Sequence, residues 1–165
     1  MSESLTKCKD EALNILSYAM RTEKQVRDKL KEKGFYEEDI EETVSYLKEY
    51  SYLDDLKYAV MYIRYAGQKG HGRRRIETEL AKRGIGKSLM EDAWYEHEKQ
   101  LMEDGIEVPS ERDRAYEAAL KVVGTKPVDD KLIAKVGRRL QTLGFDSDAT
   151  YYAVGRIMKM KNQEN

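Results

Sequence analysis

The segment IETELAKRGI, residues 76–85, occurs in three related forms in this chain of 165 residues. The other two are VRDKLKEKGF at 26–35 and VGRRLQTLGF at 136–145. Each begins with Val or Ile, has Leu four positions later, and ends in Gly followed by an apolar residue. This spacing puts both aliphatic side chains on one helical face, and the glycine is typical of the left-handed residue after a helix. We therefore predict three helices with the C-terminal glycines Gly34, Gly84 and Gly144.

Further helices are predicted on both sides of each segment. Preceding helices are expected at about 10–20, 55–67 and 111–123, with Asp54 and Ser110 as N-caps of the last two. A third helix follows each glycine, and no sustained alternation typical of strands occurs. The predicted fold class is all-α, an elongated array of three tandem three-helix, helix-turn-helix-like repeats.

The repeat spacing also predicts domain boundaries. The repeats are expected at 1–53, 54–104 and 105–165. The segment EKQLMEDGIEVPSER, residues 98–112, contains a glycine and a proline and is the predicted joint between the last two repeats. The polar tail KMKNQEN, residues 159–165, is expected to fray.

Composition restricts the class of protein. Charged residues make up 37% of the chain, the formal net charge is −1, and Cys8 is the only cysteine. A single cysteine excludes an internal disulfide and a cysteine-based zinc site. No signal peptide or apolar run of membrane-spanning length is found. We expect a reduced, soluble, cytoplasmic protein without contact with membranes.

The near-zero net charge conceals strong segregation. Residues 37–49 hold six acids and one lysine, whereas residues 64–87 hold eight Lys or Arg and two glutamates. The middle helices of the repeats, at about 22–33, 72–83 and 131–143, all carry net positive charge. These helices either present ordinary solvated faces or together form a basic face for a partner.

Signals for an enzyme are weak. Ala81, Gly86, Lys87 and Ser88 match a relaxed phosphate-loop pattern, but residues 72–83 are predicted helical and the loop aligns with helix–helix turns in the other repeats. The two histidines, His71 and His97, have no metal-ligand spacing, and no nucleophile–base arrangement is found. We predict a protein that is not an enzyme and has no cofactor.

Three arginines stand where the middle helix of the second repeat begins. The equivalent helices begin with Thr22 and Gln25, a capping box, or with Asp129. A cation in a first helical turn is unfavourable by about 0.3–1 kcal/mol at low salt. Glu77 and Glu79 are placed to pair with Arg73 and Arg75 four residues earlier. The arginines are either solvated or bind an anionic partner, which is phosphate or a carboxylate-rich protein surface.

These residues resemble a known family. The sequence YLDDLKYA at 52–59, followed by Tyr62, GQKGHG and RRRIETELAKRGI, is similar to the signature of RecX, the regulatory protein of the RecA recombinase. The likeness spans about residues 10–160. It implies a non-enzymatic protein that binds the RecA–DNA filament and limits strand exchange, ATP hydrolysis and co-protease activity. Proline is common in the family after the glycine pair, where this chain has Arg73.

The resemblance and the charge pattern together give a predicted interface. The expected partners are the RecA filament and single- or double-stranded DNA, bound weakly or as part of the filament. The alternatives are an autonomous DNA-binding module of tandem helix-turn-helix-like units and, less favoured, an NTPase that uses the Gly-Lys-Ser loop. The predicted RecA- or DNA-binding residues are Arg73, Arg74, Arg75, Lys82, Arg83, Lys69, Arg64, Lys135, Arg138 and Arg139.

Overall fold

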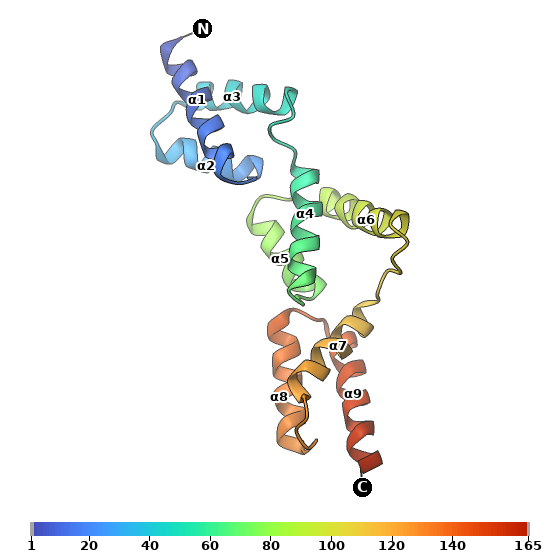
Figure 1. Ribbon diagram of the computed structural model, residues 1–165. Helices are drawn as coiled ribbons and strands as arrows, with labels where there is room; N and C mark the ends of the chain where they lie inside the picture. Colours follow the sequence, from blue (N-terminus) through green and yellow to red (C-terminus); the bar gives the residue numbers. More distant parts are fainter. Residues whose placement is uncertain (1, 165) are drawn as a thin grey trace. The chain divides into compact units, whose positions relative to one another are not determined.

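The computed structural model describes residues 2–164 of the chain. Within these residues it contains nine α-helices and no β-strand (Figure 1), so the predicted all-α class is confirmed. The helices are α1 (Glu3–Tyr18), α2 (Glu23–Glu32), α3 (Glu37–Glu49), α4 (Asp55–Gln68), α5 (Arg73–Lys82), α6 (Lys87–Glu103), α7 (Glu111–Val123), α8 (Asp130–Leu143) and α9 (Ser147–Glu164).

Most helix starts follow the predicted caps. Thr22 and Gln25 form the capping box of α2, and the side chains of Ser110 and Asp129 cap α7 and α8. Helix α1 begins earlier than predicted, because the Ser2 side chain accepts a hydrogen bond from the Leu5 amide at 3.0 Å. The predicted start near residue 10 was therefore wrong.

The C-terminal end of the chain is more regular than the sequence suggests. Helix α9 continues to Glu164 and includes residues 159–164 of the tail that is predicted to fray. In this segment Lys161 forms an ion pair with Asp130 at 2.6 Å. Asn165, the last residue of that tail, lies outside the described residues.

The three repeated glycines end their helices in the same way. Gly34, Gly84 and Gly144 have φ angles of +86°, +87° and +93°, which confirms the predicted left-handed conformation. The amide of the apolar residue after each glycine donates to a carbonyl oxygen five residues back, as at Phe145 and Leu140 (3.1 Å). In the Gly-Lys-Ser segment, Gly86 therefore lies in the turn between α5 and α6, and Lys87 and Ser88 begin α6.

The chain divides into two compact units, which are described separately. Unit 1 comprises residues 1–61 and 80–95, and unit 2 comprises residues 62–79 and 96–165. Helices α4, α5 and α6 each contain residues of both units. The repeat boundaries at 53/54 and 104/105 describe sequence periodicity and stay a prediction.

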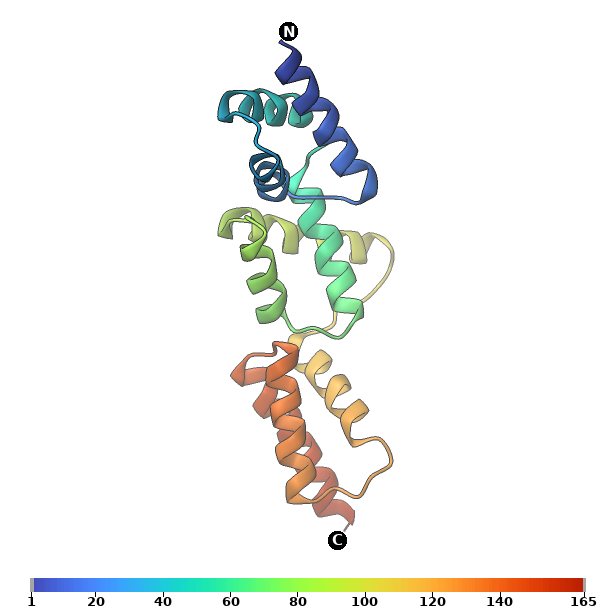
Figure 2. The ribbon, with the colours of Figure 1, turned by 90° about the vertical axis from the view of Figure 1, so that its left-hand side faces the viewer.

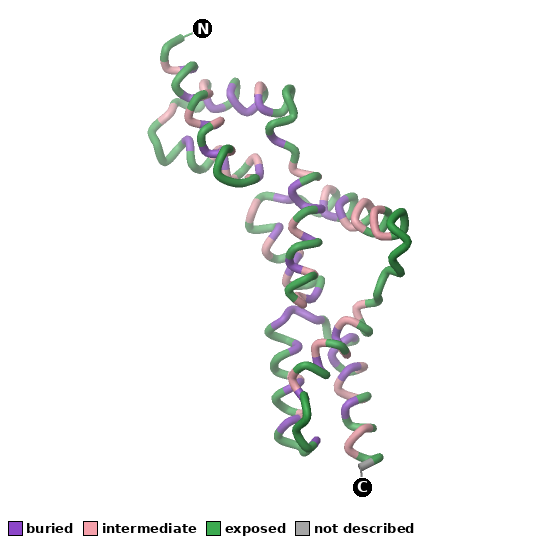
Figure 3. Tube along the Cα trace, viewed as in Figure 1, coloured by how far each residue is buried: buried purple, intermediate pink, exposed green. Residues whose placement is uncertain are grey.

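Each unit has its own apolar core, as the buried segments in Figure 3 show. In unit 1, helices α1, α2 and α3 pack pairwise around a cluster that includes the fully buried Val26, Leu30 and Leu47. In unit 2, helices α7, α8 and α9 lie against one another (Figures 1 and 2) around a cluster that includes Val136, Leu140 and Ile157. Among residues 2–164, no helix is long and apolar enough to cross a lipid bilayer.

Candidate anion-binding interface

In unit 2, the start of α5 lies directly against the end of α8. The Gly72 amide donates a hydrogen bond to the Leu143 carbonyl oxygen at 2.7 Å. A Cβ atom at Gly72 would lie 2.5 Å from the carbonyl carbon and oxygen of Gly144. Because these backbones nearly touch, no side chain fits at residue 72. The N-cap position of α5 is therefore occupied by glycine for steric reasons.

A carboxylate from another helix caps α5 instead. Glu111, the first residue of α7, accepts a hydrogen bond from the Arg73 amide at 3.1 Å. Glu111 also binds Arg114 at 2.7 Å, and Arg114 donates to the carbonyl oxygens of His71 (2.7 Å) and Gly67 (3.2 Å). The pair of Glu111 and Arg114 thus satisfies backbone groups at the end of α4 and at the start of α5.

The three arginines of α5 have different surroundings. Arg73 forms the predicted ion pair with Glu77 at 2.9 Å. The predicted pair of Arg75 with Glu79 does not form, because the Arg75 guanidinium donates to the Thr142 carbonyl oxygen at 3.4 Å near the end of α8. The Arg74 side chain has no ion pair or hydrogen bond with any residue in the described range 2–164.

The position of α8 explains why arginines are tolerated at the start of α5. The C-terminal end of a helix carries partial negative charge on its carbonyl oxygens. The end of α8 places such oxygens against the first turn of α5, where Gly72 and Arg75 bind to them. The unfavourable interaction of the arginines with their own helix dipole is thereby offset.

A groove in unit 2 is lined by five cations. Its volume is about 450 Å³, and it is formed by α7, α8 and the loop between them. Besides the five cations, Val122 and Thr142 line it. No carboxylate lines this groove, and none of the five cationic side chains forms an ion pair or hydrogen bond within residues 2–164. We call it the basic groove; its cations are Lys121, Lys126, Lys135, Arg138 and Arg139.

Two neighbouring cavities extend this positive surface. One shares Thr142 with the basic groove and is lined by Arg74 and Arg75. The other shares Lys121 and Arg139 with the groove and contains Lys69, together with Glu117 as its one carboxylate. The basic surface therefore joins cations of α5, α7, α8 and the loop after α4.

The pKa of His71 reflects this positive field. Burial is the main cause that lowers its pKa below the ordinary value of 6.5. The positive charges of Arg75, Lys69, Arg114 and Arg139 lower it further. An anion bound at this surface would therefore replace repulsion between cations by attraction.

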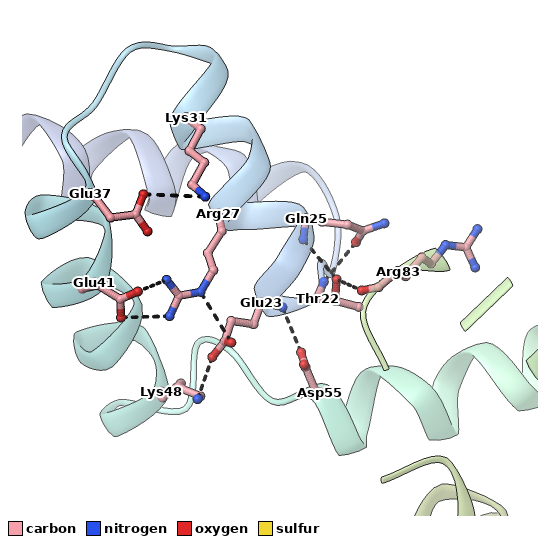
Figure 4. Close-up of polar contacts among 10 residues, drawn as sticks. All are labelled: Thr22, Glu23, Gln25, Arg27, Lys31, Glu37, Glu41, Lys48, Asp55 and Arg83. Atoms are coloured by element: carbon pink, nitrogen blue, oxygen red, sulfur yellow. Dashed lines mark hydrogen bonds and ion pairs between the residues drawn. The ribbon is translucent and has the colours of Figure 1, made fainter. Parts of the chain in front are cut away.

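The corresponding basic helix of unit 1 is neutralised. Figure 4 shows Arg27 of α2 bound by both carboxylate oxygens of Glu41 and by Glu23. Lys31 pairs with Glu37 at 3.6 Å. The acidic partners come mainly from α3, the segment with six acids. Within residues 2–164, Lys29 is therefore the one basic residue of α2 without an ion pair.

The structure brings together only part of the predicted interface. The residues that line the basic groove or its neighbouring cavities are Lys69, Arg74, Arg75, Lys135, Arg138 and Arg139. Arg73 lies beside them but lines none of these cavities. Arg64 is exposed on α4 of unit 2 outside all three. Lys82 and Arg83 belong to unit 1, where the Arg83 carbonyl oxygen accepts a hydrogen bond from Thr22.

Sequence reasoning missed two cations of the basic groove. Lys121 lies in the last turn of α7, and Lys126 follows in the loop before α8. A search of middle helices alone does not include them, because they belong to the first helix of the repeat and its loop. The signal that could have found them is the absence of acidic residues between 118 and 128.

Other candidate sites find no support in the structure. Among the described residues, no three His, Cys, Asp or Glu side chains are grouped to bind a metal ion. Tyr58 is buried, whereas Tyr65 is 49% exposed with Lys69 over its ring at 4.4 Å. Helix α4 therefore carries one tyrosine in the core and another at the surface.

Comparison with known proteins identifies the family. The model of the first three-helix domain of RecX matches residues 8–47, and that of the second matches residues 54–93. The regulatory protein RecX of Clostridium perfringens (strain 13 / Type A) is 33% identical over 98% of this chain and 74% of its own length. The RecX of Vibrio vulnificus (strain CMCP6) is 36% identical over 89% of this chain and 90% of its own length.

Solved structures agree with the sequence matches. The crystal structure of RecX from Lactobacillus salivarius covers 99% of both chains with a TM-score of 0.75 and 26% identity. A second crystal structure of a regulatory protein RecX gives a TM-score of 0.74 over 93% of this chain and 74% of that one, with 28% identity. This chain belongs to the RecX family of regulatory proteins, which lack catalytic activity and act as modulators of RecA.

Proposed function

We propose that this chain modulates RecA by binding the RecA–DNA filament in the cytoplasm, and that it inhibits the recombinase, ATPase and co-protease activities. The basic groove of unit 2 contacts the phosphates of the filament's DNA. The observation that carries this proposal is the set of five cations that line one groove without a carboxylate or an internal ion pair.

The chemistry of the groove suits phosphate. Arg138 and Arg139 offer planar guanidinium groups, which bind phosphate through two parallel hydrogen bonds. Lys121, Lys126 and Lys135 add point charges along the same groove. Each phosphate that these groups neutralise releases condensed counterions, so affinity gained here decreases with salt.

A charge reversal in the groove tests this assignment. The variant Lys135→Glu, Arg138→Glu, Arg139→Glu is expected to need at least tenfold more protein for half-inhibition of RecA ATPase on single-stranded DNA, because each lost phosphate contact is worth roughly 1 kcal/mol. The control for charge is Lys24→Glu, Lys29→Glu, Lys31→Glu on α2, which changes the same charge on exposed positions of unit 1, where Lys24 and Lys31 pair with Asp28 and Glu37. We expect this control to inhibit like the wild type.

The result that contradicts the proposal is full inhibition by the groove variant with an unchanged far-UV circular dichroism spectrum. If the α2 control also loses inhibition, net charge and not the groove is responsible. If the groove variant retains DNA binding but no longer binds RecA in the absence of DNA, the groove contacts acidic RecA surface instead.

An autonomous DNA-binding module is the second candidate, since a free basic groove also suits naked DNA. It predicts tight binding to duplex DNA alone, with a log–log salt slope near −0.9 for each phosphate contacted. The formal net charge of −1 disfavours strong binding outside the filament. Equal affinity for naked duplex and for the RecA filament would favour this second candidate.

A further inference from the structure

A cavity of about 450 Å³ lies beside the basic groove in unit 2. It is formed by α5, the end of α8 and the first turn of α9. Thr142 lines both this cavity and the basic groove, so the two are adjacent. Three of its lining residues carry the argument below: Arg74, Thr150 and Tyr151.

Thr150 is a buried polar residue without a partner. Only 7% of it is exposed, and its hydroxyl makes no hydrogen bond to any residue within 2–164. The equivalent positions in the other repeats are the buried apolar residues Ile40 and Met90. Packing at this position thus needs no hydroxyl, and a buried hydroxyl left unpaired is destabilising. Thr150 lines the cavity, but its hydroxyl oxygen is buried in this conformation, so a ligand there reaches the hydroxyl only after a rotation about χ1.

Tyr151 and Arg74 supply the other contacts that a ligand needs. Tyr151 is 77% exposed, whereas the equivalent positions are the carboxylates Glu41 and Glu91. Glu41 is used in unit 1 to bind Arg27. The third repeat therefore has an aromatic ring where the first has an anion. Arg74 lines the same cavity, and its side chain has no ion pair or hydrogen bond within residues 2–164.

We propose that this cavity binds one nucleotide of single-stranded DNA. The base stacks on the Tyr151 ring, Arg74 binds the adjacent phosphate, and Thr150 forms a hydrogen bond to a polar edge of the nucleotide. Proteins that bind single strands combine a positive groove along the backbone with aromatic side chains for the bases. The basic groove supplies the first element and the cavity the second. This inference rests on the proposed contact between the groove and DNA phosphates.

Fluorescence anisotropy of the full chain with a fluorescein-labelled oligothymidylate tests the site. We expect Tyr151→Ala to weaken binding about tenfold, within the range for loss of one stacked base. Thr150→Val, which keeps the volume and removes the hydroxyl, is expected to weaken binding about fivefold, the loss of one neutral hydrogen bond. Tyr151→Phe and Thr150→Ser keep the ring and the hydroxyl and are the matched controls, expected within twofold of the wild type.

Two further measurements separate a binding role from a structural one. Binding to a labelled duplex should be unchanged by Tyr151→Ala, because paired bases are not free to stack on the ring. The melting temperature of Thr150→Val should equal or exceed that of the wild type, because an unpaired buried hydroxyl is removed. A merely structural Thr150 would leave oligothymidylate binding unchanged in the same variant.

The proposal is overturned if the wild type does not bind oligothymidylate, or if Tyr151→Ala and Thr150→Val bind it like the wild type. It is also overturned if these variants lose only binding to RecA in the absence of DNA, because the cavity would then accept a protein segment. The groove variant of Lys135, Arg138 and Arg139 is assayed in parallel. The groove variant could lose inhibition of RecA while Tyr151→Ala binds oligothymidylate normally. That result would support the proposed function and contradict only the nucleotide site.

Discussion

The same junction between repeats occurs twice, once in each compact unit. In unit 1 the first turn of α2 meets the end of α5, and the Thr22 hydroxyl donates to the Arg83 carbonyl oxygen at 2.7 Å (Figure 4). In unit 2 the first turn of α5 meets the end of α8, and the Gly72 amide donates to the Leu143 carbonyl oxygen at 2.7 Å. Both acceptors precede the C-terminal glycine of their helix. The acceptor is thus retained while the donor changes from a side chain to the backbone.

A carboxylate from the next repeat caps the helix at both junctions. Asp55, the first residue of α4, accepts from the Glu23 amide at 2.9 Å. Glu111, the first residue of α7, accepts from the Arg73 amide at 3.1 Å. Because this cap comes from outside the helix, the first turn of α5 does not need Ser, Thr or Asp of its own. Its positions are thereby free to carry arginines.

The largest expected effect comes from a methyl group at the repeated glycines. All three have φ near +90°, so alanine at each costs about 1–2 kcal/mol from backbone strain. At Gly34 a Cβ meets nothing within 4 Å, at Gly84 it lies 2.6 Å from Lys24 Cβ, and at Gly144 it lies 2.1 Å from Arg75 Cβ. We expect Gly144→Ala to lower the free energy of unfolding by on the order of 4 kcal/mol or more, and Gly84→Ala to lower it by less. Gly34→Ala should lower it only by the cost of the backbone strain.

Urea unfolding followed by circular dichroism measures this series. Gly34→Ala is the internal control for the φ angle. If the three variants lose the same free energy of unfolding, the helices at the two junctions do not approach as closely as the backbone positions indicate.

A smaller effect is expected from neutralising the two capping carboxylates. Glu111 holds Arg114, whose side chain is only 17% exposed, so Glu111→Gln removes an ionic partner and is expected to cost about 1–3 kcal/mol. Burial is the main cause that raises the pKa of Asp55, so its charge is disfavoured there. We expect Asp55→Asn to cost less, about 1 kcal/mol or below. Thermal unfolding at pH 7 compares the stability of the two variants. A larger loss of stability in Asp55→Asn than in Glu111→Gln would contradict this ranking.

The smallest effect is expected from pH, and only in unit 2. Burial first, and then the neighbouring cations, depress the pKa of His71, so the folded protein favours the neutral imidazole. Stability from this group is complete above about pH 6.5 and decreases as the pH falls through the depressed pKa. His97 acts in the same direction, whereas unit 1 contains no histidine.

Hydrogen exchange resolved along the chain, compared at pH 7.5 and 5.5 after correction for intrinsic rates, checks this asymmetry. We expect protection to decrease in unit 2 more than in unit 1, and His71→Gln to reduce that difference. A uniform decrease in both units would exclude the histidines as its source.

The fold was largely predictable because its signals are local. The Leu–Gly spacing, the capping box at Thr22 and the caps at Ser110 and Asp129 each act within a few residues of the chain. Helix α1 begins earlier than predicted, because the Ser2 cap and the buried Leu5 extend it to Glu3. The predicted pair of Arg75 with Glu79 does not form, because the competing acceptor lies on α8.

The candidate interface was predictable only in part. The sequence identified basic middle helices but treated α2 and α8 as equivalent. Tertiary structure distinguishes them, because α3 supplies carboxylates to α2 while none lines the groove beside α8. Lys121 and Lys126 join the interface through packing of α7 against α8, and the acid-free segment 118–128 is their only local signal.

The sequence alone thus determined the helices, most of their ends and the repeat, because hydrogen bonds and apolar spacing within a helix are set by neighbouring residues. Only the tertiary structure decided which cations are free, which glycine is required by a close approach, and which polar side chain lacks a partner. Charges and backbone groups far apart in the chain interact at short range. Their partners are therefore fixed by packing and not by the order of residues.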